Sequence, residues 1–425
     1  MEVIFAIFYL SGIIKSFLIF YKIPFIVDFT LFAAFLVIIA VFIEFKNKKI
    51  PIVFNKNNLL AFVFLLIFYL WMIISLIWTP SNNYSFKKVF FFLPNIISFG
   101  FPLIYKRFDI AKFFRIISIA LIIVSIVFLK IYLDYSADKI SRAYYQPILG
   151  LYLTCSSLMG INILVILGAK KKVFKNLFIS SFVVTLSIIL MFLLGARGPL
   201  IFVLLLLIPL LFIKFFKLSY FKILLSSDFR KVLFSGFTIL FFLTFSLIFE
   251  NEVKVLLDRS AYRLGLLLPL PESETNSLQK QAGSEGSAMG KSVDLRVDQL
   301  RFSTNLLKQN KLESIYGFGI GSFGLLYYAK DFRSYPHNIF LEIWIELGLI
   351  GLILFLIFLY FIFTKNLNGV NYINILVLMY IILNVLKSSS FIDIRIFMAV
   401  FAFYMLDSND KYLNKNENNI ILKTS

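Results

Sequence analysis

The long apolar runs of this sequence are the feature that most constrains its fold. Leu59 to Trp78 contains no charged residue, and neither does Pro199 to Ile213. A membrane helix needs about 20 apolar residues to cross about 30 Å of hydrocarbon. Of all 425 residues, 60% are hydrophobic and 15% are charged, whereas soluble domains are about 45–50% apolar and about 25% charged. The sequence therefore predicts an all-α, polytopic membrane protein.

Twelve apolar runs are predicted as membrane spans. They are residues 3–21, 29–45, 59–78, 89–105, 116–133, 148–168, 177–194, 199–216, 233–249, 339–363, 371–386 and 396–406. The chain then has four regions. Residues 1–249 hold nine transmembrane helices, residues 250–338 form one large polar loop, residues 339–406 hold three more transmembrane helices, and residues 407–425 form a tail.

The basic residues are unevenly divided between the linkers. Alternate linkers, counted with the tail, hold 21 Lys and Arg residues, and the other short linkers hold about nine. Because cytoplasmic loops are enriched in Lys and Arg, the richer set is predicted to lie in the cytoplasm. Both termini are then cytoplasmic, and the large loop 250–338 is extracytoplasmic. The net charge of +19 is accordingly interpreted as a sign of topology and not of nucleic-acid binding.

The large loop has two segments with a recognisable pattern. Its middle, Gly283 to Ser292, is rich in Gly and Ser and is predicted to be a flexible linker. Residues 293–310 follow, and their apolar side chains recur at helical spacing at Val293, Val297, Leu300 and Leu307. This stripe predicts an amphipathic helix that lies near the outer membrane surface.

Two glycine patterns do not predict a nucleotide site. Gly319 to Gly324 satisfies G-x-G-x-x-G, but no strand precedes it and no βαβ unit surrounds it. Gly290-Lys291-Ser292 resembles the end of a P-loop, yet Glu285 stands where the first glycine is required. We expect the glycines of residues 319–324 to provide tight turns and close backbone packing instead.

Metal and redox chemistry have little support in the sequence. One cysteine and one histidine cannot supply a zinc site with the usual ligand spacing. Cys155 lies in an apolar span and is predicted to be a small packing residue. We therefore expect no metal and no cofactor.

The single histidine, His337, stands where the large loop ends and the tenth span begins. It is either an interfacial residue at the start of a helix or a general base, since histidine has an unperturbed pKa near neutral pH. Glu342 and Glu346 follow one and two turns later, and acidic residues in a membrane helix are costly unless they face a polar cavity. Each could orient His337, line a site, or only contact a neighbouring helix.

Arg197 is the second unusual position, because it lies in the shortest outer turn, Gly195-Ala-Arg-Gly-Pro199. It either extends to lipid phosphates or holds a phosphate with both arms of its guanidinium. Arg296 and Arg301, in the predicted amphipathic helix, could converge on the same phosphate or pair with nearby acidic residues. Arg333 is a further candidate in the same loop.

Three segments together resemble the O-antigen ligase and O-antigen polymerase superfamily of bacterial surface-polysaccharide assembly. The first is the Gly-Ala-Arg197-Gly turn before a leucine-rich span. The second is Asp294-Leu-Arg296, and the third is Pro336-His337-Asn338-Ile-Phe-Leu-Glu342 with the later Glu346-Leu-Gly-Leu-Ile-Gly351. The residue before Arg197 is Ala, where the family more commonly has Ser or Thr. Twelve spans with one large periplasmic loop between the ninth and tenth also agree with this family.

The resemblance implies a GT-C-like transferase of the bacterial inner membrane that inverts the sugar linkage without a metal. The donor would be a glycan linked to undecaprenyl pyrophosphate, and the acceptor a second glycan or lipid A-core. Arg197 and Arg296 would hold the pyrophosphate, and His337 would deprotonate the attacking hydroxyl. Arg301, Arg333, Asn338 and Glu342 would contact substrate. Membrane lipid and a chain-length regulator are expected partners, and nucleic acid is not.

Three activities remain open at this point. A polymerase joins lipid-linked repeat units, and it is favoured because the run Pro336 to Glu342 resembles polymerases. A ligase transfers the finished polymer to lipid A-core. A flippase or transporter would need charged residues or broken helices at mid-membrane depth, whereas the polar residues here gather at the outer surface.

Overall fold

The computed structural model describes residues 1–24, 28–46, 56–105, 108–137, 139–168, 173–196, 198–207, 284–367, 372–388 and 390–407, and these residues form helices and no strand. The α-helices are α1 (Glu2–Tyr9), α2 (Ser11–Phe20), α3 (Phe29–Lys46), α4 (Lys56–Ile74), α5 (Tyr84–Ile104), α6 (Ile110–Ser136), α7 (Arg142–Tyr145), α8 (Leu151–Gly168), α9 (Leu177–Leu193), α15 (Ser284–Gln309), α16 (Glu313–Tyr316), α17 (Phe323–Tyr328), α18 (Ile339–Leu367), α19 (Tyr372–Ser388) and α20 (Arg395–Asp407). A further helix covers Gly198–Leu207, and 3₁₀ turns occur at η1 (Ser75–Ile77), η2 (Gln146–Ile148) and η3 (Phe391–Asp393).

The prediction of an all-α polytopic membrane protein is confirmed. Five described stretches are long and apolar enough to cross a membrane: Asn58–Ile77, Tyr84–Ile104, Ile110–Ser136, Gln146–Leu167 and Ile339–Thr364. The pair α1 and α2, bent by 60°, makes a sixth if it counts as one span. Twelve spans therefore stay a prediction, and the predicted span 233–249 lies outside the described residues.

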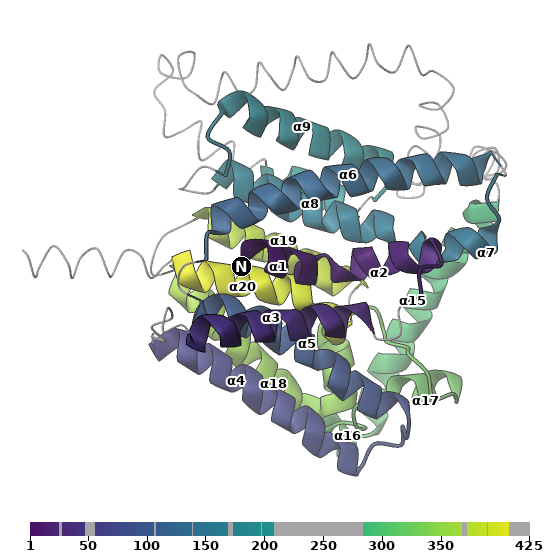
Figure 1. Ribbon diagram of the computed structural model, residues 1–425. Helices are drawn as coiled ribbons and strands as arrows, with labels where there is room; N and C mark the ends of the chain where they lie inside the picture. Colours follow the sequence, from purple (N-terminus) through teal and green to yellow (C-terminus); the bar gives the residue numbers. More distant parts are fainter. Residues whose placement is uncertain are drawn as a thin grey trace, which may run out of the picture.

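The helices pack side by side into a bundle, and α15, α16 and α17 gather at one end of it, which we call the loop end (Figure 1). Within the bundle, α18 packs on α4, and α20 packs on α5. Helix α4 shows why such sequences suit a bilayer. One of its faces is fully buried, while the opposite face exposes apolar side chains to the surroundings; the buried residues are Ala61, Leu65, Phe68 and Met72, and the exposed ones include Val63, Leu66 and Leu70. Cys155 is buried in α8, as a packing residue would be.

Helix α18 is broken inside the bundle at Gly348. This glycine has φ +69°, a left-handed conformation that side chains other than glycine rarely adopt. A Cβ atom at this position would also lie 2.2 Å from the carbonyl oxygen of Ile315. The predicted span 339–363 therefore contains a kink at Gly348, and the loop segment at Ile315 fits against this kink.

The break exposes carbonyl groups that a continuous helix would use itself. Donors from other segments satisfy them. The oxygens of Ile345, Glu346 and Leu347 accept from Phe318 N at 2.8 Å, Gly319 N at 2.9 Å and Trp71 Nε1 at 2.9 Å, respectively. The loop segment is thus hydrogen-bonded into the middle of α18.

The glycines beside this contact allow close backbone approach. Gly317, Gly319 and Gly321 all have positive φ, and a Cβ at Gly319 would lie 2.4 Å from the Cα of Thr79. The expectation that the glycines of residues 319–324 provide tight turns and close backbone packing is confirmed at Gly319 and Gly321.

Helix α15 differs from its predicted form in two ways. It already begins at Ser284, so most of the segment Gly283 to Ser292 is helical and not a linker. Between its glycines this segment contains residues that favour helices, namely Glu285, Ala288, Met289 and Lys291. The prediction of a linker underestimated their effect. The predicted apolar stripe is also split, since Val297 and Leu300 are exposed while Leu307 is buried. The face that packs on the protein carries Gln299 and Ser303 with Leu307.

Candidate functional site

Two helix caps fix the loop that carries His337. Before it, the carboxylate of Asp331 accepts hydrogen bonds at the start of α5, from Ser81 Oγ, Asn82 N and Asn83 N, at 2.7, 3.1 and 2.8 Å. Burial raises the pKa of Asp331, but these hydrogen bonds outweigh that effect and hold it below its usual value. After it, the side chain of Asn338 caps α18 by accepting from the N–H groups of Phe340 and Leu341, both at 3.1 Å. His337 therefore stands between two anchored points.

His337 itself has a strained backbone and an unfilled ring nitrogen. Its φ is +55°, a conformation that costs about 1–3 kcal/mol in a non-glycine residue and is concentrated at functional sites. The side chain is half-buried, and its Nδ1 atom is buried with no hydrogen-bond partner among the described residues. The ring of Tyr335 lies against it, with 4.7 Å between the ring centroids.

The surroundings keep the imidazole neutral. Burial, followed by the positive charge of Arg296, lowers the pKa of His337 to about 4. At neutral pH one ring nitrogen therefore carries a lone pair that can accept a proton. The charge of the same guanidinium also acts on the hydroxyl of Tyr335.

Arg296 is half-buried on the protein-facing side of α15. It precedes Gln299 and Ser303 on that face by about one and two helical turns. Its Nε atom is buried and has no hydrogen-bond partner in the described part of the chain. Arg296 and His337 thus each have a buried nitrogen that no described residue satisfies, and the charge of Arg296 acts on the ring of His337.

Arg301 does not join this pair. Five residues correspond to about 140° around a helix, and Arg301 is exposed on the other side of α15. Arg197, the remaining arginine of the sequence prediction, lies outside the described residues.

Glu342 belongs to a buried charge network, which we call the Lys88 network: Lys88, Glu342 and Glu346. All three side chains are 0% exposed. Lys88 Nζ lies 2.6 Å from Glu342 Oε1 and 2.7 Å from Glu346 Oε2. The sequence prediction had placed Glu342 at the substrate. The structure instead gives its carboxylate a complete set of internal partners.

The Lys88 network joins four segments of the chain. Glu342 also accepts from Ser390 Oγ at 2.7 Å and from Phe391 N at 3.0 Å, which ties α18 to η3. Glu346 accepts from Gly321 N at 2.9 Å, which ties α18 to the glycine loop. Sequence reasoning missed Lys88, because it lies just before the predicted span 89–105, whereas α5 already begins at Tyr84.

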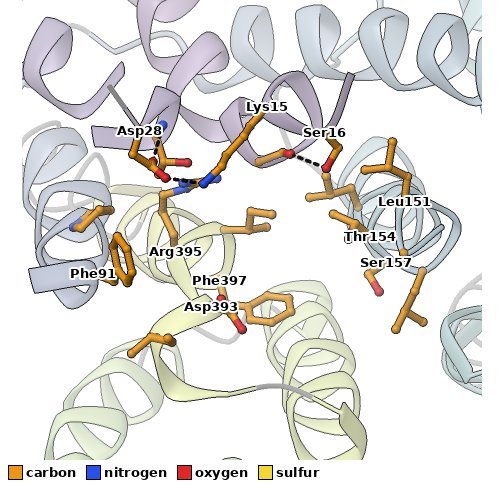
Figure 2. Close-up of a pocket in the computed structure, with 18 of the residues that line it drawn as sticks. Lys15, Ser16, Asp28, Phe91, Leu151, Thr154, Ser157, Asp393, Arg395 and Phe397 are labelled. Carbon is orange, nitrogen blue, oxygen red and sulfur yellow. Dashed lines mark hydrogen bonds and ion pairs between the residues drawn. The ribbon is translucent and has the colours of Figure 1, made fainter. Parts of the chain in front are cut away.

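A cavity of about 670 Å³ lies next to His337. Arg333 and Tyr335, from the His337 loop, form part of its wall. Arg333 is paired with Asp393 of η3, and Arg395 at the start of α20 also lines the cavity. Figure 2 shows Arg395 beside Lys15 and Asp28, and Thr154 on another side of the cavity. Lys15, Asp28, Asp393 and Arg395 were not among the predicted site residues, because no motif connects positions so distant in sequence.

Among the described residues, no group of three or more His, Cys, Asp or Glu residues could hold a metal ion. The polar groups near His337 are instead guanidinium, imidazole and phenol groups. This set can bind an anion and accept a proton.

The family comparison agrees with this site. Residues 182–356 match the family model described as O-antigen ligase. This segment contains Arg296, His337 and the broken part of α18. No curated protein matches the chain. The segment that carries the candidate site is thus similar to the O-antigen ligase family, a family of glycosyltransferase-like enzymes.

Proposed function

We propose that this protein polymerises oligosaccharide repeat units linked to undecaprenyl pyrophosphate into an O-antigen or a related surface polysaccharide. The observation that carries the proposal is the pair formed by His337 and Arg296. Both have a buried nitrogen without a hydrogen-bond partner among the described residues. Such groups are costly unless a ligand completes them.

The proposed reaction needs little more than positioning, charge stabilisation and a base. An acceptor hydroxyl attacks the anomeric carbon of the donor sugar, and the bond from that carbon to the pyrophosphate oxygen breaks. The configuration inverts, the electron pair leaves with the pyrophosphate, and the hydroxyl proton passes to His337. Arginines that face the leaving group stabilise the negative charge that develops on it.

The lowered pKa of His337 fits this sequence of events. In the free protein the nearby Arg296 charge and burial keep the ring unprotonated. A bound pyrophosphate would neutralise Arg296 and raise the pKa of His337, because a neighbouring negative charge favours the imidazolium. The ring would then become a stronger base only when the donor is in place.

Arg197 is proposed as the second pyrophosphate ligand on the basis of its sequence segment. Arg301, which is exposed, would meet the glycan outside the immediate site. Asn338 uses its side-chain oxygen as a helix cap, so only its amide N–H₂ group remains for substrate. Glu342 would act indirectly, by holding the start of α18 in place.

The proposed setting is the bacterial inner membrane. Residues 250–338 would lie outside the cytoplasm and both termini inside it. Spans 1–9 would fall in residues 1–249, spans 10–12 in residues 339–406, and the tail in residues 407–425. The partners would be the lipid-linked donor, the acceptor glycan, membrane lipid and a chain-length regulator.

Ligation to lipid A-core is the second candidate, since the same site chemistry serves a different acceptor. Transport is disfavoured. The broken helix α18 resembles a transporter feature, but loop backbone and Trp71 occupy the carbonyls at its break.

Deletion of the gene, followed by a gel of surface lipopolysaccharide, tests the proposal. A single repeat unit on the core indicates the polymerase. Absence of glycan from the core, with polymer still on the carrier lipid, indicates the ligase. Repeat units retained on the cytoplasmic side would contradict both and indicate a flippase.

A further inference from the structure

The cavity beside His337 contains five charged side chains, and four of them form two ion pairs. Lys15 of α2 pairs with Asp28 before α3, and Arg333 pairs with Asp393. Asp28 also accepts from the N–H groups of Thr30 at 2.9 Å and Leu31 at 3.4 Å, and so caps α3. Both carboxylates are therefore engaged by other groups.

The fifth charged side chain, Arg395, has no such partner. An arginine has five N–H donors. In the described structure, its guanidinium makes one long hydrogen bond, from Nη2 to Tyr9 O at 3.4 Å. It lies over the ring of Phe8, 5.1 Å from the centroid. Its Nε atom is buried and unpaired among the described residues. Asp28 and Asp393 attract the charge from a longer distance.

The backbone holds Arg395 in place. Ser98 Oγ of α5 donates to the carbonyl oxygen of Arg395 at 2.7 Å, and Asn95 Nδ2 donates to that of Ile392 at 3.1 Å. The start of α20 is therefore fixed by two side chains of α5. Figure 2 shows the Arg395 side chain extending from α20 toward Lys15 and Asp28. A preorganised guanidinium with unfilled donors at a cavity wall is a ready anion site.

We infer that this cavity binds the pyrophosphate of a second lipid-linked glycan, the acceptor, with Arg395 as its anchor. The inference rests on the proposed polymerase function, in which two lipid-linked pyrophosphates must be held at once. The charge of Arg296 acts on His337, so we assign Arg296 to the donor. Arg395 lies in the cavity on the other side of Tyr335, which lines the cavity and also contacts His337.

The rest of the cavity suits a lipid-linked ligand of this kind. Its volume of about 670 Å³ lies within the usual range of about 300–1,000 Å³ for small-molecule sites. Thr154 and Ser157 of α8 supply hydroxyl groups that can bond sugar or phosphate oxygens, while Phe91, Leu151 and Phe397 supply apolar surface. A ligase has one lipid-linked pyrophosphate and would have no use for a second site.

Counting bound carrier lipid tests the inference. The full-length protein is placed in nanodiscs and titrated with radiolabelled undecaprenyl pyrophosphate without sugars. The variants are Arg395→Met, Arg395→Lys, Arg296→Met and the control Arg115→Met. Arg115 is a half-buried arginine that is engaged structurally, since its Nε and Nη2 donate to Val173 O at 3.1 and 2.9 Å.

The wild type and Arg115→Met are expected to bind two molecules of undecaprenyl pyrophosphate per protein. Arg395→Met and Arg296→Met are each expected to bind one. Arg395→Lys keeps the positive charge but lacks the planar guanidinium that binds phosphate through two N–H groups. The second lipid pyrophosphate should therefore bind to this variant about 10-fold more weakly. This variant decides the matter if Arg395→Met does not fold. Inorganic pyrophosphate should compete for both equivalents.

Four outcomes would overturn the inference. Two full-affinity equivalents in both Arg395 variants would show that Arg395 holds no pyrophosphate. One equivalent in the wild type that is lost only in Arg296→Met would leave the proposed function standing without a second site. Displacement of the Arg395-dependent equivalent by phosphatidylglycerol would assign the cavity to bilayer lipid. No binding in the wild type would remove the proposed donor as well as the acceptor site.

Discussion

Two clusters of charged and polar groups flank the first turn of α18, and they differ in how completely their atoms are bonded. The Lys88 network is fully buried, and both of its carboxylates bond the lysine and groups from other segments. Arg296 and His337 are half-buried, and each has a buried nitrogen that no described residue satisfies.

The difference separates structural charge from functional charge. A buried ion pair in an apolar bundle is tolerated when its geometry is complete, and then it fixes one arrangement of the helices. A buried donor left open costs free energy in the empty protein, and bound substrate recovers that cost. His337 and Glu342 are only five positions apart. By their hydrogen bonding, Glu342 has a structural role, whereas His337 is open to a substrate.

The strongest expected loss follows from removing the base. His337→Gln should lower single-turnover transfer from purified lipid-linked donor by about 10²- to 10⁴-fold. Gln keeps hydrogen-bonding capacity but cannot take up the proton. Donor binding should survive, because arginines hold the pyrophosphate. Near-normal transfer by His337→Gln would show that His337 has a structural role, as the Lys88 network does.

Breaking the Lys88 network should act on stability. Lys88→Met leaves two buried carboxylates unpaired and should lower the free energy of unfolding by about 3–5 kcal/mol. The measurement is thermal unfolding of the purified protein together with its abundance in membranes. Adding Glu342→Gln and Glu346→Gln to this variant removes the two unpaired carboxylate charges. The triple variant should therefore recover most of the lost free energy of unfolding. A stable Lys88→Met protein without transfer activity would instead place the network in the site.

Arg296 sharpens the comparison, since a matched control lies on the same helix. Arg296→Lys should lower transfer by about 10²- to 10³-fold, the usual effect of losing one donor to developing negative charge. A lysine does not reproduce the planar fork. Lys308→Arg, at an exposed position of α15, should remain near the wild type in the same assay. Equal losses in both variants would point to a general effect of α15 on folding.

The pKa of His337 gives the smallest and cleanest readout, because the chain has one histidine. In protein labelled with ¹³C-histidine, the single ring signal should titrate near pH 4. Arg296→Met removes a positive charge, so the midpoint should rise, and inorganic pyrophosphate should raise it in the wild type. A midpoint near 6.5 in all samples would mean that neither burial nor Arg296 controls the ring.

The sequence was enough to predict the all-α membrane architecture, because long apolar runs leave few other structures. It also singled out His337 and Arg296 through their segments. It could not predict the break in α18, since Gly348 looks like any small residue within an apolar run. The bond between Glu342 and Lys88 could not be predicted, because the two residues are 254 positions apart in the sequence. Arg395 was missed for the same reason.

The broken helix has a consequence for motion. The backbone of residues 317–319 completes the hydrogen bonding of α18, so neither segment can shift without exposing carbonyl groups inside the bundle. Helix and loop are interlocked and move as a single body. Leu307 near the end of α15 packs with Phe323 and Ile345 and so belongs to this body. A closing movement over the glycan would then have to come from the part of α15 that precedes Leu307. Substrate entry and product exit would then depend on a movement of this part of α15 relative to α18 and residues 317–319, which stay fixed to one another.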